Sequence, residues 1–539
     1  MVARSLWTAA LSTAVGILSC LSIGAAESPA PIAHAINESL RGEVKATSAA
    51  TGPVDDGVFL RRAHLDLVGC VPRPGEITAF LLDPAADKRA KLVNQLLDDP
   101  RFGKNWGRYF RDVIMYRKTE DRATIINNVL HDYLAKELNA NSPWSKIATD
   151  MITASGDALE KGECGLIVAQ QGQPEETVAE VSRIFMGVQI SCAQCHDHPW
   201  DQWKREQFHE LAAFFPRVAS RLILTPDRRT ITVVANDFPR GFGRGPANQR
   251  FSGTLEHYMP DLKNPESKGK EMKPVFFATG DSLTFGARDA DRRGKLAEWM
   301  TKRENPYFAK AFANRLWGEL CGEGFYEPLD DIGPDRECSA PRTCDKLAAA
   351  FAASNYDVKQ LFRVIMATDL YQAESRPRRE ADQPPFQANV AQRLRSDVIL
   401  DNLMAVIGFQ VSDDATSGPN RPNLRNPRNA FATTFGYDPS QRRDEVSGSI
   451  LQALAMMNGP QVNASINGNG LTELSRLLRE IRDDNELVSE LYLRTLGREP
   501  TATELKTCRD YIVKVNRRTE AFEDLQWSLI NSTEFLYRK

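Results

Sequence analysis

The sequence predicts a mainly α-helical protein, with two helical domains separated by a small insert that contains a β-hairpin. Apolar residues recur at helical spacing over most of the chain, and Pro and Gly interrupt this pattern where helices would end. A short stretch in the middle is rich in β-branched residues and turn signals instead. The chain has 539 residues, more than one hydrophobic core usually accommodates, which predicts more than one domain.

The composition is that of a globular protein without a strong charge bias. Hydrophobic residues make up 42% of the chain and charged residues 26%, so a packed core is expected. The formal net charge of −3 gives no electrostatic basis for binding nucleic acid. We therefore expect no nucleic-acid partner.

Residues 1–26 have the pattern of a secretory signal peptide. Arg4 supplies the positive charge, residues 6–23 are apolar, and residues 24–26 are the small residues that precede cleavage. An uncleaved membrane anchor is the alternative, because the apolar run approaches the length that spans a bilayer. No later stretch is as long and apolar. We expect an exported protein, periplasmic or at the cell surface, with no integral membrane segment after signal cleavage.

The first helical domain is predicted over residues 57–216. It follows a small and polar linker, residues 27–56. Within the domain, Trp106, Tyr109 and Phe110 fall on one face of a predicted helix. An apolar face of this kind is typical of a helix that packs into a core, so we expect these side chains to be buried.

The predicted insert covers residues 217–287. Its segments 222–225 and 230–234 are rich in β-branched and apolar residues and flank a Pro-Asp-Arg-Arg turn, which is the pattern of a β-hairpin. Helical periodicity returns after the insert. Residues 288–539 are therefore the predicted second helical domain.

One stretch, residues 191–215, concentrates the candidate chemistry. Within it Cys192, Cys195 and His196 form a C-x-x-C-H motif, which is typical of c-type haem attachment. Two thiols at this spacing can add to the two vinyl groups of one haem, and the adjacent histidine can ligate the iron. The helical patterns on both sides predict a helix–loop–helix around the motif. We expect haem c at this site, with His196 as the proximal iron ligand.

The sequence does not single out a sixth iron ligand. His198 belongs to the same short loop as the proximal histidine, which constrains its reach. The other candidates by residue type are His209, Met186, Met259 and Met272. A five-coordinate iron is the further alternative, and it would favour peroxide or small-ligand chemistry over electron transfer. Whether the protein is an enzyme is therefore an open question at this stage.

Other interpretations of the motif stay open beside haem attachment. One is a site for zinc or another transition metal, although four ligands so close in sequence crowd a tetrahedron. Its ligands would be Cys192, Cys195, His196 and His198, with Asp197 or Asp201 as a further candidate. A second is a local disulfide, with the histidines and Asp197 stabilising the helix ends. A third is a C-x-x-C redox site.

Apart from Cys20, six further cysteines lie outside the motif. They are Cys70, Cys164, Cys321, Cys338, Cys344 and Cys508. An exported protein can form disulfides, and six cysteines allow 15 pairings, of which Cys338 with Cys344 closes the shortest loop. The alternative is that several of them are buried as small apolar residues.

Two polar features of the second domain are candidates for buried or catalytic roles. Asp330 and Asp331 form a carboxylate pair on a loop, which we interpret as a helix cap or a solvated turn, with a catalytic pair as the alternative. Arg315 interrupts an otherwise apolar helix, and we interpret it as a buried structural partner. The chain has no nucleophile elbow, P-loop, dinucleotide fingerprint or zincin motif.

Several blocks of this sequence resemble a two-domain secreted family from planctomycete-type bacteria. In that family a cytochrome-like (PSCyt) domain precedes a PSD domain of unknown function. In the first half the resembling blocks are residues 62–69, 72–74, 80–83, 106–112 and 191–215. In the second half they are residues 305–309, 314–317, 328–331, 371–372, 452–454, 458–460, 491–500 and 531–537. The resemblance implies that 57–216 is PSCyt-like and 288–539 PSD-like.

The chain departs from the family pattern at two places. His209 stands where the family pattern has a tyrosine, and Cys338 and Cys344 stand where it has a Pro-Ser loop. The first departure argues against His209 as an iron ligand shared by the family. The second makes the cysteine pair a feature of this chain.

Together these observations predict an exported, cytochrome-like protein with a redox or electron-transfer role. The main alternative is a non-enzymatic secreted binding or scaffold protein with a structural Cys/His block, and a hydrolytic enzyme with a Cys/His metal site comes third. The family resemblance implies that its partners are other exported proteins of the same gene neighbourhood.

Overall fold

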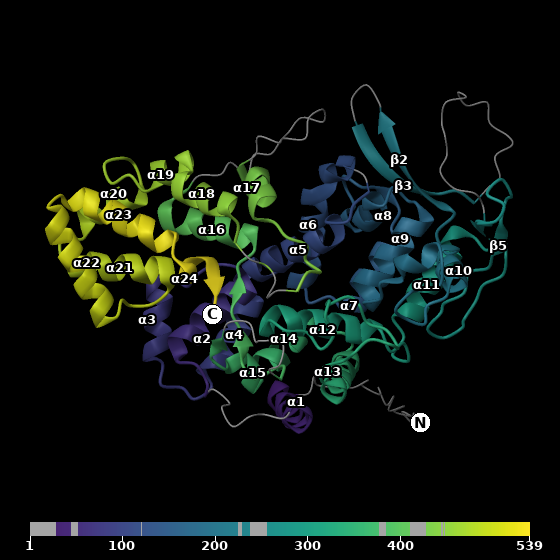
Figure 1. Ribbon diagram of the computed structural model, residues 1–539, viewed down its shortest axis with the longest axis horizontal. Coiled ribbons are helices and arrows are strands. Elements are labelled where there is room, and N and C mark those ends of the chain that lie inside the picture. The colour runs from purple at the N-terminus through teal and green to yellow at the C-terminus, as the bar shows by residue number, and fades with distance from the viewer. Residues whose placement is uncertain are drawn as a thin grey trace, which may run out of the picture.

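The computed structural model confirms the mainly α fold, and the strands of the described residues form sheets of only two or three short strands (Figure 1). The predicted signal peptide, residues 1–26, lies outside the residues that the structure describes. Those residues are 28–44, 52–119, 121–224, 229–237, 256–376, 384–409, 427–442, 446 and 448–539. Within them, no helix combines the length and the apolar character needed to cross a bilayer.

The N-terminal half consists of short helices, of which α5 shows how the sequence sets their limits. Asp99 accepts a hydrogen bond from a backbone N–H of the first turn, and Pro100 takes the first helical position. Trp106, Tyr109 and Phe110 of α5 are buried, as predicted. The α-helices of this half are α1 (Pro29–Glu43), α2 (Asp56–Val68), α3 (Pro74–Leu82), α4 (Lys88–Asp98), α5 (Pro100–Met115), α6 (Asn127–Asn139), α7 (Trp144–Thr153), α8 (Gly165–Ala169), α9 (Pro174–Val181) and α10 (Arg205–Ala212).

The insert contains the predicted hairpin. Strands β2 (Val218–Leu224) and β3 (Arg229–Ala235) pair antiparallel, and β1 (Gly156–Asp157) extends the sheet along the other edge of β3. A second, two-stranded sheet follows, formed by β4 (His257–Met259) and β5 (Lys270–Met272). Because β4 packs against α10, this part of the insert lies next to the helix that follows the cysteine motif.

The C-terminal half is again helical, and its four short described strands form two pairs. Its α-helices are α11 (Asp289–Met300), α12 (Phe308–Cys321), α13 (Pro341–Ala353), α14 (Val358–Met366), α15 (Asp369–Gln372), α16 (Ser396–Ile407), α17 (Pro427–Phe435), α18 (Ile450–Asn458), α19 (Pro460–Ser465), α20 (Glu473–Glu480), α21 (Asp484–Leu496), α22 (Ala502–Val515), α23 (Arg518–Ile530) and α24 (Thr533–Leu536). Its strands are β6 (Ser375–Arg376), β7 (Asn389–Val390), β8 (Gln392–Arg393) and β9 (Tyr537–Arg538).

Two hydrophobic cores organise the described residues. The first joins the N-terminal helices to α11–α15, with Phe110, Trp144 and Phe312 among its packed aromatic rings. The second belongs to α16–α24 and also takes in Leu65 and Val71 from the N-terminal half. In Figure 1 the helices of the second core lie at one end of the long axis, and β2, β3 and β5 lie at the other.

The C-terminal residues are tied back to the N-terminal half. β9 pairs with β8, and the buried side chain of Arg538 reaches Asp66 on α2. Its Nε and one Nη donate to the two carboxylate oxygens of Asp66 at 3.0 and 2.8 Å. The hydroxyl of Tyr371 donates to the same carboxylate at 2.8 Å. This charge pair links strand β9, near the C-terminus, to helix α2, and no local pattern in the sequence indicated it.

Replacing Arg538 with Ala is expected to lower the free energy of unfolding by about 2–3 kcal/mol, because Asp66 loses a charged partner but keeps the Tyr371 hydroxyl. The matched control is Arg509→Ala, which removes an exposed arginine of α22 and is expected to change stability by less than about 0.5 kcal/mol. Urea unfolding of the two variants, followed by tryptophan fluorescence, measures the difference. Equal stabilities would show that the Arg538–Asp66 pair does not hold the C-terminus.

Candidate functional site

The C-x-x-C-H motif lies in the connection between α9 and α10, so the predicted helix–loop–helix is confirmed. α9 continues as one turn of π-helix, Ser182–Met186, and then turns at Gly187, whose φ is 65°. A Cβ atom on Gly187 would lie 2.8 Å from Cδ1 of Ile332, so both the backbone and the close packing require glycine here. A short 3₁₀ turn, Ile190–Gln194, then carries Cys192.

The three residues of the motif that would hold a haem are all exposed. Cys192 and Cys195 are free thiols, and the ring of His196 faces solvent. The Nδ1 atom of His196 lies 2.7 Å from the backbone carbonyl oxygen of Asp197. A carbonyl only accepts hydrogen bonds, so Nδ1 carries the proton and Nε2 keeps its lone pair. This is the tautomer that an iron ligand on Nε2 requires.

His198, by contrast, is a buried structural residue of the same loop. Burial lowers the pKa of its ring, and the charge of Arg336 lowers it further, so the ring is neutral at pH 7. Its Nδ1 accepts from the backbone N–H of Trp200 at 3.3 Å, and the ring also hydrogen-bonds the backbone carbonyl of Gln189. Since both ring nitrogens are engaged within the loop, His198 fixes the loop and is not presented as a ligand.

His209 is likewise buried, and it holds the motif to the insert. Its Nε2 lies 3.0 Å from the backbone oxygen of Gln194, and its Nδ1 lies 2.9 Å from Nε2 of His257 on β4. Burial lowers the pKa of both histidines to about 4, so both rings are neutral at pH 7. The carbonyl must accept, so His209 donates through Nε2 and accepts the Nε2–H of His257 at Nδ1. No ring nitrogen of His209 is left for an iron.

Asp197 stabilises the start of α10. Its carboxylate accepts from the backbone N–H of Arg205 at 3.1 Å and pairs with the ammonium group of Lys204 at 3.1 Å. The first of these contacts, helped by the second, lowers the pKa of Asp197. The side chain therefore stabilises the N-terminal end of α10, which agrees with the interpretation that Asp197 stabilises a helix end.

The remaining predicted ligands do not gather around the motif. In the described part of the chain, no group of three or more His, Cys, Asp or Glu side chains is arranged to hold a metal ion, so the zinc alternative gains no support. The cysteines that the structure describes are all free thiols, and no disulfide joins any of them. Met186 and Met272 are buried, and Met259 lies in β4.

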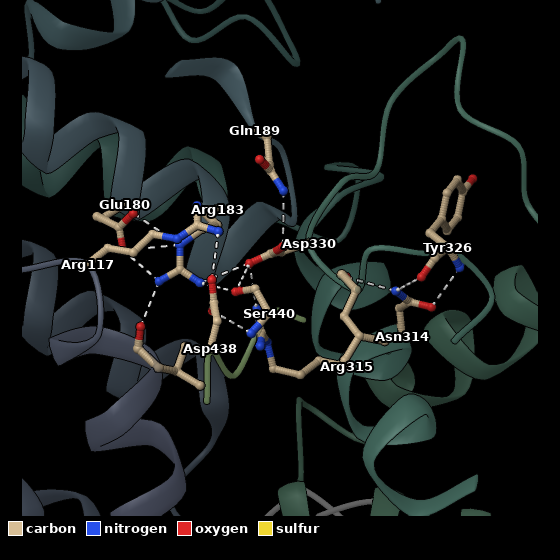
Figure 2. A network of polar contacts seen from close by, with 12 residues as sticks. Arg117, Glu180, Arg183, Gln189, Asn314, Arg315, Tyr326, Asp330, Asp438 and Ser440 are labelled. Atoms are coloured by element: carbon tan, nitrogen blue, oxygen red, sulfur yellow. Dashed lines mark hydrogen bonds and ion pairs between the residues drawn. The ribbon is translucent and has the colours of Figure 1, made fainter. Parts of the chain in front are cut away.

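Beside the motif lies a network of buried charges centred on Arg183 (Figure 2). Arg183 belongs to the π-helical turn, and its side chain is only 3% exposed. It donates to Glu180 at 2.6 Å, to Asp330 at 2.9 Å and to the hydroxyl of Ser440 at 2.8 Å. Turns of π-helix occur often at functional sites. Here the turn places the guanidinium group of Arg183 within hydrogen-bonding distance of Glu180, Asp330 and Ser440.

Asp330 is the acidic centre of this network. Arg315 of α12 lies 3.3 Å from its carboxylate, and the Ser440 hydroxyl donates to it at 2.6 Å. Burial alone would raise the pKa of Asp330, but the charges of Arg315 and Arg183 outweigh burial and lower it. The prediction that Arg315 is a buried structural partner is confirmed. The interpretation of Asp330 as a helix cap or solvated turn is wrong, because its carboxylate is completely buried between two arginines.

The network contacts the segment that leads into the motif. Gln189, just before the 3₁₀ turn that carries Cys192, donates to Asp330 at 3.3 Å, and the backbone N–H of Ile332 donates to the Gly187 carbonyl at 2.6 Å. Sequence reasoning missed Arg183, Ser440 and His257. Arg183 gave the same signal as Arg315, an arginine inside an apolar helical run, but nothing in the sequence marked Ser440 or His257 as their partners.

The comparison with protein families agrees with this architecture. Residues 31–220, which include the motif, match PSCyt2, described as a protein of unknown function (DUF1549). Residues 292–431, which include α12 and Asp330, match PSD1, also described as a protein of unknown function (DUF1553). The chain therefore belongs to the proteins that combine these two domains of unknown function, which confirms the resemblance. Neither a curated protein nor a solved structure matches the chain.

Proposed function

We propose that this chain is an exported cytochrome-like protein that binds haem c covalently through Cys192 and Cys195, with His196 as the proximal ligand and with a redox or electron-transfer role. One observation carries the proposal. Of the three histidines in the block, His196 alone exposes a ring nitrogen with a lone pair, while His198 and His209 have both nitrogens engaged. In the C-x-x-C-H motif the histidine directly after the second cysteine is the iron ligand, and that residue is His196.

The residues present fit the chemistry of thioether attachment. Both thiols are free and exposed, so they can form carbon–sulfur bonds without opening the core. Ala193 between them is fully buried and anchors the turn. Trp200, further along the loop, is 73% exposed and offers an apolar surface on the same loop. Bound haem c would supply one-electron redox chemistry at the protein surface.

The other residues of the block orient and support this site. The Asp197 carbonyl holds the proton of His196 at Nδ1, which fixes the ring and leaves Nε2 directed elsewhere. His198 and His209 tie the two ends of the loop to Gln189 and Gln194. Preorganisation by such neighbours keeps a ligand in place before the cofactor arrives.

The test is expression of the full chain together with haem-maturation machinery, followed by a pyridine haemochrome spectrum and an intact mass. One covalent haem per chain and a ferrous α-band near about 550 nm are expected. The double variant Cys192→Ser/Cys195→Ser should carry no covalent haem. The matched control Cys70→Ser, which removes a half-buried thiol elsewhere, should carry the same amount as the wild type.

Three other outcomes would contradict the proposal. A protein of haem-free mass whose Cys192 and Cys195 both react with a thiol reagent has no haem attached. A stoichiometric transition metal without haem, detected by elemental analysis, would favour the Cys/His metal site. Absence of both would favour the non-enzymatic binding or scaffold role.

A further inference from the structure

A second pair of cysteines, outside the motif, lies where the chain enters α13. Cys344 is completely buried in the first turn of α13, and Cys338 is half-buried in the loop just before it. The sulfur of Cys338 lies within hydrogen-bonding reach of the Cys344 thiol, the backbone N–H of Ala340 and the hydroxyl of Tyr326. Two thiols are thus neighbours, one partly exposed to solvent and the other shielded from it.

The loop that carries Cys338 is held at both ends. The backbone N–H of Ser339 donates to the carbonyl of Phe325 at 2.8 Å. At the start of α13, Glu43 of α1 accepts from the backbone N–H groups of Arg342 and Thr343 at 2.7 and 2.8 Å. These contacts hold the loop that carries Cys338 and the first turn of α13 that carries Cys344 in fixed positions.

The environment of Cys338 favours its thiolate form. Donation by the Cys344 thiol is the largest cause, and the Ala340 N–H and the Tyr326 hydroxyl add to it against the effect of burial; together they lower the pKa of Cys338 to about 7. Burial instead raises the pKa of Cys164 to about 12. The thiolate is the form of cysteine that attacks disulfides.

We propose that Cys338 and Cys344 form a reversible dithiol–disulfide pair, in which Cys338 is the attacking thiolate and Cys344 the resolving thiol. The half-exposed position of Cys338 admits a small disulfide, and the buried position of Cys344 excludes one. The proximity of the two thiols then favours closure within the pair over attack by a second external thiol. This inference does not depend on haem binding at the motif.

The step balances with an external small-molecule disulfide such as oxidised glutathione as the oxidant. The Cys338 thiolate attacks one sulfur of that disulfide, forms a mixed disulfide and releases the first thiolate. Cys344 loses its proton to water and attacks the Cys338 sulfur, which releases the second thiolate. Two protein thiols are oxidised by two electrons, and one external disulfide is reduced to two thiols.

The pair sits on a loop that also touches the motif segment. Arg336, just ahead of Cys338, lies 3.2 Å from the carboxylate of Asp331 and 3.6 Å from that of Asp201 in the motif loop. Gln202 donates to Asp335 of the same loop at 2.8 Å. A covalent change at Cys338 would therefore occur next to contacts that support the motif.

The experiment is a site-resolved redox titration of the folded full-length protein in glutathione buffers of varied ratio, with acid quenching, alkylation and tryptic mass mapping. Arg336, Arg342 and Lys346 place the two cysteines in separate tryptic peptides, so a Cys338–Cys344 bond appears as a linked peptide pair. The fraction of linked peptide is expected to rise and fall with the glutathione redox potential along a single two-electron titration curve. Cys164 in the same samples is the buried-thiol control and should form neither a glutathione adduct nor a disulfide.

Two variants separate the roles of the cysteines. Cys344→Ser should accumulate a glutathione adduct on Cys338, because the resolving thiol is missing. Cys338→Ser should leave Cys344 unmodified, with an alkylation rate lower than that of Cys338 in the wild type by a factor on the order of ten or more. The wild-type titration needs no variant, so misfolding of either one does not remove the test.

The proposal is overturned if the linked peptides never form in excess oxidised glutathione. It is equally overturned if the bond resists dithiothreitol until the protein unfolds, which would make it a permanent structural disulfide. An adduct on Cys344 rather than Cys338 in the single variants would reverse the assigned roles.

Discussion

Replacing Asp330 with Ala is expected to lower the free energy of unfolding by about 3–5 kcal/mol, the usual cost of removing one partner from a buried charge network. The change leaves Arg183 and Arg315 facing each other in the interior without the carboxylate between them. Ser440 and Gln189 also lose their shared acceptor. Urea unfolding followed by both fluorescence and circular dichroism measures the change, and the two probes must coincide for a free energy to be derived.

The neighbouring carboxylate provides the matched control. Asp331 pairs with Arg336 at 3.2 Å near the surface, and burial raises the pKa of Asp331 despite the opposing charge of Arg336, so folding does not favour its charged form. Asp331→Ala is expected to cost less than about 1 kcal/mol. If the two variants were equally stable, the ion pairs around Asp330 would not support the fold. Faster hydrogen exchange at Gln189 in Asp330→Ala, but not in Asp331→Ala, would show that the network also stabilises the segment before the motif.

The architecture was predictable because it follows from local patterns. Helical periodicity placed the apolar face of Trp106, Tyr109 and Phe110 correctly, and β-branched runs around a Pro-Asp-Arg-Arg turn placed the hairpin. These signals act within one element and do not depend on distant partners. By contrast, the pairing of Arg538 with Asp66 joins residues at opposite ends of the chain, and no periodic pattern encodes such a contact.

For the candidate site, the sequence identified the C-x-x-C-H motif, which led to the hypothesis of haem attachment, and it missed the arrangement of the side chains around the motif. The spacing of Cys192, Cys195 and His196 indicated covalent attachment, because that geometry is local. Which histidine offers a lone pair depends on partners outside the motif. The ring of His209 is engaged by Gln194 and by His257 from the insert, and only the folded chain brings these groups together.

The same limitation explains the misinterpreted carboxylates. Asp330 and Asp331 look equivalent in the sequence, but one is completely buried between arginines and the other pairs with Arg336 near the surface. The difference arises because the π-helical turn delivers Arg183 from a segment far away in the chain. Adjacent identical residues thus acquire opposite pKa shifts, because two arginines outweigh burial at Asp330, whereas burial outweighs Arg336 at Asp331.

Acidification from pH 7 to pH 5 is expected to lower the free energy of unfolding by about 4–6 kcal/mol through three buried histidines. Burial lowers the pKa of His64, His209 and His257 to about 4, whereas an exposed histidine has a pKa of 6.5. Between these values the unfolded chain binds more protons than the folded chain, so stability is present above pH 6.5 and falls as the pH drops towards 4. Each proton contributes roughly 1.4 kcal/mol per pH unit, and the lower limit allows for the mutual contact of His209 and His257.

Two variants test whether these histidines cause the acid sensitivity. His64→Leu should reduce the loss between pH 7 and pH 5 by about one third, and it should fold well at pH 7, because Nδ1 of His64 has no hydrogen-bond partner among the described residues. His34→Gln, on the exposed face of α1, is the control and should leave the loss unchanged. Urea unfolding of both variants and of the wild type at the two pH values measures this loss of unfolding free energy. If His64→Leu lost as much unfolding free energy as the wild type, the acid sensitivity would come from other groups. A buried histidine lowers stability in acid only because the unfolded chain takes up a proton that the folded chain does not.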